Sequence, residues 1–154
     1  MAAEKPASRA KESIRTWLRL LSCETHVEQR LRAYFRDNFS VTLPQFDVLS
    51  ELERARDSLT MSQLSDELMV SNGNITGVVD RLEKVGYVRR VRSQTDRRIQ
   101  HIELTEAGLA EFRTMARKHE RQVRELFAEL SLNEMSQLQK LLIKARQSVI
   151  HSDS

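Results

Sequence analysis

The 154-residue sequence predicts a mainly α-helical fold, in which a winged helix-turn-helix lies between long N- and C-terminal helices. Apolar residues recur at three- and four-residue steps along most of the chain, and one short segment rich in Val, Ile and Arg interrupts that pattern. Only four Gly and two Pro break the helical periodicity. We expect three segments: an N-terminal dimerisation helix in 1–40, the winged helix-turn-helix in 41–106, and C-terminal dimerisation helices in 107–154.

The composition excludes several classes of protein. With 40% hydrophobic and 31% charged residues, the chain has the composition of a folded domain and not of a disordered one. No stretch approaches the ~20 apolar residues of a bilayer-spanning helix, and the N-terminus lacks the apolar core of a secretory signal, so we expect a cytoplasmic protein. The sequence contains no G-x-S-x-G motif and no phosphate-binding glycine loop, so we expect neither an enzyme nor a cofactor.

The first predicted element is one long amphipathic helix over residues 10–38. Its apolar positions fall at helical spacing: Ile14, Trp17, Leu18, Leu21, Val27, Leu31, Tyr34 and Phe35. A helix of about 28 residues would be roughly 42 Å long, which exceeds the width of a domain of this size. We therefore expect part of its apolar stripe to pack against a second chain.

Three shorter helices follow. The second begins at Leu43-Pro44, because proline is favoured in the first turn, and the third opens with a capping box from Thr60 to Gln63. Ser71 can cap the fourth, and Gly86 suits the left-handed residue that ends a helix. Their inward positions are Phe46, Leu49, Leu52, Leu64, Leu68, Ile75, Val78, Val79 and Leu82.

The segment from Tyr87 to Leu104 predicts a two-stranded hairpin around a polar turn at 93–96. Thr105 and Glu106 then open a fifth helix, and a second capping box from Ser131 to Glu134 opens a sixth. Both helices carry an apolar stripe, which completes the pattern of flanking helices around a small winged lobe.

Positive charge is concentrated in that lobe. The whole chain has a net charge of only +3, but the segment from Arg81 to Arg98 contains seven basic and two acidic residues, and six of the seven are arginines. This segment covers the end of the fourth helix and the hairpin, which a winged helix presents to phosphates. The forked guanidinium group suits phosphate contacts and insertion into a narrow minor groove.

The start of the fourth helix has side chains suited to base contacts. Asn can pair with adenine through two hydrogen bonds, and Thr can contact the methyl group of thymine. Gly73 and Gly77 each destabilise a helix by about 1 kcal/mol relative to Ala, a cost easier to explain where the backbone must approach a partner closely. A solvated polar helix start beside a basic hairpin is the alternative explanation.

Three segments of the sequence resemble the MarR (multiple antibiotic resistance regulator) transcription factors. They are TLPQFDVLSEL, LSDELMVSNGNITGVVDRLEKVGYVRR and the wing DRRIQHIELTEAG, in the order and spacing of that family. The resemblance covers nearly the whole chain. It implies a homodimer, joined by its N- and C-terminal helices, that places two recognition helices in successive major grooves of palindromic double-stranded DNA, most often as a repressor.

The resemblance also implies roles for individual residues. Asp96 would orient the wing, Arg98 would enter the minor groove and Arg97 would lie near the phosphate backbone. The base-contacting face would hold Ser71, Asn72, Asn74 and Thr76, and the charge pattern adds Arg81 to this DNA-binding set. Gly77 occupies a position where many relatives have a basic residue, so base recognition would depend on the Asn and Thr side chains and on DNA shape.

The segments SNGNITG and TLPQFD look most like the branch that controls aromatic-acid catabolism and is released by the acid or its CoA thioester. Such an effector needs a pocket with an aromatic wall and a group that meets an anion. Trp17, Leu21, Thr25 and Phe46 are candidates for the wall and a hydroxyl, and His26, Arg30 and Arg36 for the anion partner. Plain core packing is the alternative for each apolar member, and solvation for each arginine.

The sequence leaves functions other than effector-controlled DNA binding open. Cys23 in the first helix, with His26 one turn later, suggests a thiol-based redox sensor. Two features disfavour it: Glu24 beside the sulfur disfavours a thiolate, and the following turn holds Val27 and not a tyrosine. The histidines and Cys23 show no metal-ligand spacing beyond that one pair. An adaptor that dimerises without binding DNA is a further alternative, and salt-dependent binding to duplex DNA separates it from a regulator.

Overall fold

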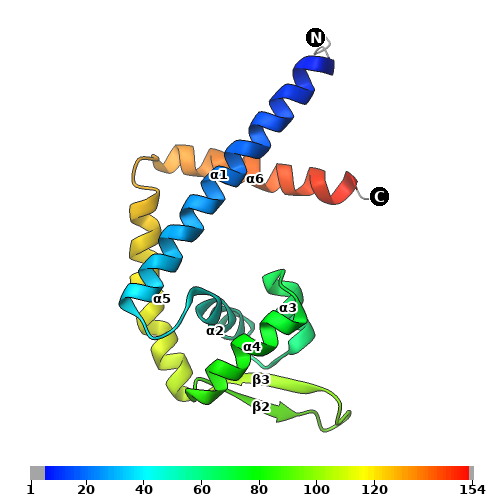
Figure 1. Cartoon of the computed structure of the whole chain (residues 1–154), viewed down its shortest axis with the longest axis vertical. Coiled ribbons are helices and arrows are strands. Elements are labelled where there is room, and N and C mark those ends of the chain that lie inside the picture. Colours follow the sequence, from blue (N-terminus) through cyan, green and yellow to red (C-terminus); the bar gives the residue numbers. More distant parts are fainter. Residues whose placement is uncertain (1–5, 153–154) are drawn as a thin grey trace. The chain divides into compact units, whose positions relative to one another are not determined.

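The computed structural model describes residues 6–152, apart from the side chains of residues 6, 7 and 72. In order, the described chain forms α1 (Pro6–Asn38), α2 (Leu43–Ala55), β1 (Leu59–Thr60), α3 (Met61–Leu68), α4 (Asn72–Lys84), β2 (Val88–Arg92), β3 (Gln100–Leu104), α5 (Glu106–Leu126) and α6 (Leu132–Ser152) (Figure 1). The mainly helical winged fold is therefore confirmed. The chain divides into two compact units, Met1–His119 and Glu120–Ser154, with the boundary inside α5.

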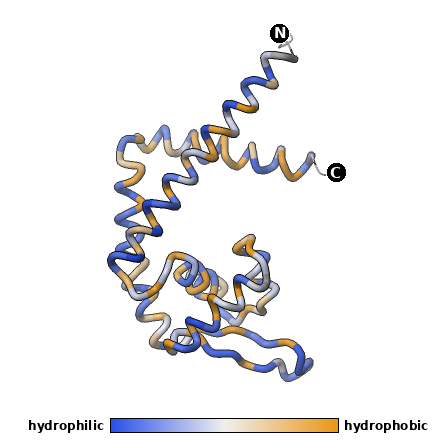
Figure 2. Tube along the Cα trace, in the orientation of Figure 1, coloured by the Kyte–Doolittle hydropathy of each residue, from blue (hydrophilic) through white to orange (hydrophobic). Residues whose placement is uncertain are grey.

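The wing belongs to a three-stranded antiparallel sheet in the order β1-β3-β2. Strands β2 and β3 pair from Val88 with Leu104 to Arg92 with Gln100, and the loop that joins them is mostly hydrophilic (Figure 2). The predicted hairpin is thus present, but β1 was not predicted. Its two residues are too few to show alternation, and Thr60 serves at once as a strand residue and as the cap of α3.

Side-chain caps fix where the helices of the winged lobe begin. The hydroxyl of Thr60 accepts a hydrogen bond from the Gln63 amide at 3.2 Å, and the Gln63 side chain accepts one from the Thr60 amide at 2.8 Å. Ser71 caps α4 by accepting from the Asn74 amide at 3.4 Å, as predicted. A further capping box at Thr42 opens α2, where the pattern Thr-x-x-Gln was present in the sequence.

The base of the wing is joined to the start of α5. Gly86 has a φ of 81° just beyond the end of α4, which confirms the predicted left-handed residue. The Thr105 hydroxyl donates to the Gly86 carbonyl oxygen at 2.6 Å, and the Thr105 amide donates to the Tyr87 carbonyl oxygen at 3.1 Å. The same hydroxyl accepts from the Gly108 amide at 3.0 Å, so one threonine links the hairpin to the first turn of α5.

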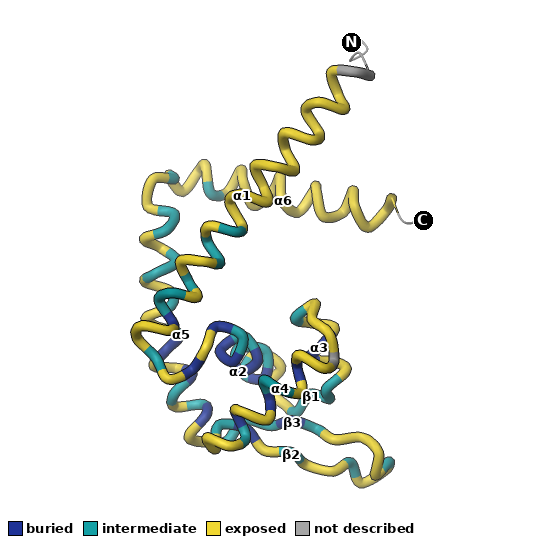
Figure 3. The backbone as a smooth tube through the Cα atoms, in the orientation of Figure 1, coloured by how far each residue is buried: buried dark blue, intermediate teal, exposed yellow. Residues whose placement is uncertain are grey.

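An apolar core lies in the first unit, between its helices and the sheet (Figure 3). Its fully buried side chains come from every long element of that unit except the N-terminal half of α1: Phe35, Val48, Leu49, Leu64, Ile75, Val79, Leu82, Val88, Ile102 and Met115. An aromatic cluster extends it, with the Phe46 ring stacked on Phe112 at 5.4 Å and 4.9 Å from the His119 ring. Burial lowers the pKa of His119.

The second unit comprises the end of α5 and α6, and most of the apolar side chains of α6 are exposed. No residue of α6 is buried within this chain, and the Ser131 capping box predicted at its start is present, with a Ser131 amide bond of 2.8 Å to Glu134. The N-terminal half of α1 is similarly exposed, with Trp17 at 57% and Leu18 at 55%. Among the described residues, no helix is long and apolar enough to cross a membrane.

Candidate nucleic-acid interface

The polar residues at the start of α4 lie on the surface. Ser71, Asn74 and Thr76 are exposed, whereas Ile75 and Val79 point into the core. The backbone of Asn72 belongs to the first turn of α4, but its side chain lies outside the described residues. The first two turns of this helix therefore present amide and hydroxyl groups to solvent, in the arrangement that contact with base edges requires.

Neither glycine of α4 is required by packing within the chain. A Cβ atom built at Gly73 or at Gly77 would have no atom within 4 Å. Residues 73 and 77 are one turn apart and so share a face of α4, and both line a hollow beside α1 and α2. The helix thus gives up intrinsic stability at two open positions, and the absence of side chains there leaves its backbone accessible to a large partner.

The loop of the wing is held in shape by local hydrogen bonds. The Asp96 carboxylate accepts a bond from the Arg98 amide at 3.0 Å, and the Asp96 amide donates to the Ser93 hydroxyl at 3.3 Å. The Arg98 side chain is 94% exposed, with its Nε atom 3.6 Å from the Asp96 carboxylate, and Arg97 is exposed beside it. Asp96 therefore fixes the backbone from which the Arg98 guanidinium extends into solvent.

The wing adjoins the start of α3. A shallow hollow of about 320 Å³ is lined by Arg98 and Gln100 of the hairpin and by Thr60 and Ser62 at the first turn of α3. A helix N-terminus carries partial positive charge and free amide groups, so this hollow has the same electrostatic sign as the arginine. The arrangement is suited to a phosphate group that passes between wing and helix.

Not all of the basic residues counted in the sequence are available to a ligand. The Arg89 guanidinium pairs with Glu103 on the neighbouring strand at 2.8 Å, and Arg90 pairs with Asp80 and Glu83 of α4. Arg92, Arg97 and Arg98 are exposed further along the hairpin. Within the hairpin, the positive charge that is not paired with another strand or with α4 is thus concentrated toward the end of the wing, and the count of basic residues overstated the charge available to a ligand.

Arg81 lies on a different side of α4 from the wing. It lines a cleft of about 510 Å³ between the C-terminal half of α1, α2 and α4, which we name the α1–α4 cleft and whose polar lining comprises Glu28, Arg32, Asp47, Asn74 and Arg81. Arg32 bonds to Glu28 at 2.6 Å, while Arg81 makes no ion pair among the described residues. Burial raises the pKa of Asp47 to about 6. The positive charge of Arg32 lowers this pKa in part, and the negative charges of Glu51 and Glu28 raise it further.

The predicted effector residues do not line this cleft. Trp17 and Leu21 are exposed on α1, Thr25 is half-buried, and Phe46 is buried in the aromatic cluster of the core. His26, Arg30 and Arg36 are exposed; the His26 Nδ1 atom donates to the Ser22 carbonyl oxygen at 2.6 Å, and Arg36 donates to Asp37 at 3.1 Å. Glu28, Arg32 and Asp47 were missed because charged residues at helical spacing resemble an ordinary solvated face.

Cys23 is exposed on α1. The neighbouring His26 is engaged with a backbone carbonyl through one ring nitrogen and makes no described bond to the sulfur. In the part of the chain that the structure describes, no three His, Cys, Asp or Glu side chains gather as metal ligands would.

Comparison with known proteins identifies relatives of this lobe. The model of the MarR family matches residues 39–99, which span α2, α3, α4, β2 and the wing loop. The HTH-type transcriptional regulator PecS of Dickeya dadantii is 29% identical over 116 residues, which cover 74% of this chain and 70% of PecS. This relative supports the expectation that the chain is not an enzyme.

Two solved structures with bound DNA have a similar fold. A mutant of MarR from Escherichia coli, complexed with operator DNA, is 27% identical, has a TM-score of 0.77 and is matched over 87% of this chain and 95% of its own. FabT of Streptococcus pneumoniae in complex with DNA is 29% identical, with a TM-score of 0.72 over 90% of this chain and 98% of its own.

Proposed function

We propose that this chain is a transcriptional regulator of the MarR family, that it binds palindromic duplex DNA as a homodimer, and that it represses transcription until a small effector releases it. The observation that carries the proposal is the exposed Arg98 of the wing, held by Asp96, together with the exposed polar start of α4. The similarity to MarR and FabT, both solved with DNA, supports the same conclusion.

On duplex DNA, the first turns of α4 would enter the major groove. Ser71, Asn72, Asn74 and Thr76 would face base edges, and the open backbone at Gly73 and Gly77 would allow a close approach. Arg98 would insert into the adjacent minor groove, where its guanidinium meets a concentrated negative potential. Arg97 and the start of α3 would contact phosphates, which position the protein but carry no sequence information.

A second copy of this chain is the proposed occupant of the exposed apolar faces. Trp17, Leu18 and Leu21 on α1, and Leu141, Leu142 and Ile143 on α6, are each at least 41% exposed. Complete burial of one such side chain contributes roughly 1.5–3 kcal/mol, so together they would stabilise a dimer strongly. A twofold dimer also explains a palindromic site, because each half-site would meet one recognition helix about 34 Å from the other.

The effector is proposed to be an aromatic carboxylate or its CoA thioester. The sequence-predicted wall and anion partners are Trp17, Leu21, Thr25, His26, Arg30, Arg36 and Phe46. The α1–α4 cleft, which these residues do not line, offers Arg81 as a separate anion partner. Because Asn74 and Arg81 belong to the recognition helix, a ligand in this cleft would contact the helix directly. An effector need only bind better to the dimer whose recognition helices are misplaced, since differential affinity shifts the population.

The proposal is tested with duplex DNA fragments from the region flanking the gene, titrated at several salt concentrations and followed by fluorescence anisotropy. We expect the logarithm of affinity to fall linearly with the logarithm of salt concentration. Asn74→Ala should relax the base preference in a selection from random duplexes. Binding that is absent at every salt concentration would refute the regulator and favour an adaptor.

The effector is sought by thermal shift with aromatic acids and their CoA thioesters, because a ligand selective for the native state raises its apparent stability. A compound that raises the melting temperature should also weaken DNA binding. The redox alternative rests on the exposure of Cys23. A peroxide titration that leaves DNA affinity unchanged would remove it.

A further inference from the structure

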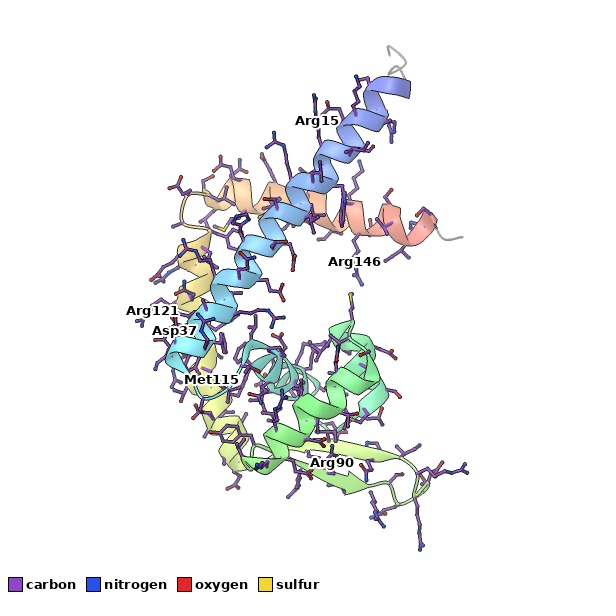
Figure 4. The ribbon with its side chains drawn as sticks, viewed as in Figure 1. Arg15, Asp37, Arg90, Met115, Arg121 and Arg146 are labelled. Atoms are coloured by element: carbon purple, nitrogen blue, oxygen red, sulfur yellow. The ribbon has the colours of Figure 1, made fainter. Side chains whose placement is uncertain are left out.

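Arg90 differs from the other arginines of the wing in what it contacts. Its side chain is 21% exposed, and its guanidinium donates through Nη2 to Asp80 and through Nη1 to Glu83, both on α4 (Figure 4). The hydrogen bond to Asp80 is the main reason that the pKa of Arg90 is raised. One side chain of β2 therefore bridges two successive turns of the recognition helix.

The Arg90 side chain lies where it can fix the angle between β2 and α4. Helix α4 and strand β2 are joined by only three residues, and the Tyr87 amide donates to the Leu82 carbonyl oxygen at 2.9 Å, which fixes their separation at the base. That bond holds the base of the hairpin and does not reach its outer part. Arg90 adds two bonds further along β2, and the continuous pairing of β2 with β3 transfers that constraint to the whole hairpin.

Asp80 is an unexpected residue on a DNA-facing helix. It follows Thr76 by four residues and so lies on the same face, one turn further along, with its side chain 56% exposed. A free carboxylate at this position would repel DNA phosphates. Pairing with Arg90 neutralises that charge and at the same time uses it to orient the wing.

We propose that Arg90, held by Asp80 and Glu83, is a positioning residue that fixes the wing relative to the recognition helix, and that it does not itself contact DNA. The proposal rests on the proposed function of DNA binding. A side chain that already forms two charge-assisted hydrogen bonds in a forked geometry is a poor candidate for a phosphate contact, because it would have to give up one set of bonds for the other.

Removing the two carboxylates separates positioning from simple electrostatics, because the two explanations predict opposite signs. Asp80→Asn combined with Glu83→Gln raises the net charge by two, so an electrostatic effect alone would strengthen DNA binding. If the carboxylates position the wing, we expect a fall in affinity of about tenfold or more, with an unchanged salt slope. Equal or tighter binding by this double variant would overturn the proposal.

Glu103→Gln is the matched control. Glu103 pairs with Arg89 within the same hairpin but makes no described contact to α4. Its removal raises the net charge without releasing the wing from the helix, so we expect affinity equal to that of the unmodified protein or slightly higher. A loss as large as that of the double variant would also contradict the proposal.

Arg90→Gln tests the arginine itself. A phosphate contact would lower the salt slope by about 0.9 when removed, whereas a positioning residue would weaken binding without changing the slope. If Arg90→Gln does not fold, as judged by circular dichroism, the single variants Asp80→Asn, at an exposed position, and Glu83→Gln, at a half-buried one, carry the test. Absence of salt-dependent binding by the unmodified protein would instead refute the proposed function.

Discussion

The backbone carbonyl oxygen of Tyr87 lies only 2.0 Å from the position that a Cβ atom on Gly108 would occupy. No real Cβ atom tolerates such a contact, so the first turn of α5 can approach the base of the wing only because residue 108 has no side chain. The sequence Leu-Thr-x-x-Gly after the wing therefore has a physical basis. Thr105 caps α5 and links it to the base of the wing, and Gly108 permits the close approach of α5 to Tyr87.

Gly108→Ala is expected to destabilise the protein by at least about 2 kcal/mol, because the methyl group must displace backbone and not a flexible side chain. Urea unfolding followed by circular dichroism measures the change. A variant as stable as the unmodified protein would show that α5 can shift away from Tyr87 without loss of packing.

Gly77→Ala is expected to have the opposite effect on stability and a separate effect on binding. A methyl group there meets no atom of the chain, so the helix should gain up to about 1 kcal/mol from the better propensity of alanine. If the open backbone faces DNA, affinity should fall roughly tenfold in spite of that gain. Unchanged affinity in the anisotropy titration would place Gly77 outside the interface.

Arg98→Ala is expected to weaken DNA binding by roughly 1 to 3 kcal/mol and to reduce the salt slope by about 0.9. The side chain is 94% exposed and has little to lose within the fold, so the melting temperature should not change. Arg121→Ala, an exposed position on α5 outside the matched lobe, is the control and should leave both quantities unchanged. Identical results for the two variants would show that the wing assignment is wrong.

Asp47→Asn is expected to stabilise the protein at neutral pH but not at pH 4. Burial raises the pKa of Asp47 from 3.8 to about 6, so the folded state holds its proton more tightly than the unfolded state. The associated stability is present below pH 3.8 and is lost as pH rises through about 6. Two pKa units correspond to roughly 3 kcal/mol, and solvent screening of this half-buried carboxyl reduces the expected gain to about 1 kcal/mol.

Urea unfolding of both proteins between pH 4 and 8 checks this prediction. The lowered pKa of His119 gives the opposite slope, since stability falls as pH decreases below 6.5, the ordinary pKa of histidine. His119 is common to both proteins, so their difference isolates Asp47. A difference that is constant across the pH range would mean that Asp47 ionises normally in the folded state.

Leu18→Glu is expected to shift the protein from a dimer to a monomer. In sedimentation, the apparent mass should fall from twice 17.9 kDa to 17.9 kDa, while the circular dichroism of the winged lobe is retained. Thr16→Glu adds the same charge on the opposite side of the exposed part of α1 and should leave the assembly intact. A stable monomer of the unmodified protein at micromolar concentration would contradict the proposed dimer.

The order of helices and the wing followed from local signals. Helical periodicity, the capping residues at Thr60, Ser71 and Ser131, and the left-handed Gly86 each depend on a few neighbouring residues, and all were predictable. Strand β1 was not, because Leu59 and Thr60 become a strand only through pairing with Ile102 and His101, more than forty positions away.

The candidate site divides in the same way. The exposed polar start of α4 and the Asp96–Arg98 wing follow from short motifs. The pairing of Arg90 with Asp80, and the meeting of Arg32, Asp47 and Arg81 in one cleft, depend on how distant elements pack, and a charge count treats all such residues as equivalent. The arginine-rich segment is therefore predictable from the sequence, but which of its arginines form internal ion pairs and which stay exposed is not.

Thr105 links α5 to the base of the hairpin, so a small rotation at the base displaces the far end of the hairpin much further. Each strand extends about 17 Å from its base, so a tilt of about 10° at Gly86 would displace the far end by about 3 Å, as much as the length of a hydrogen bond. If Arg98 lies in a groove of DNA as proposed, a small rotation of the first turn of α5 would withdraw it through the bonds of Thr105 alone.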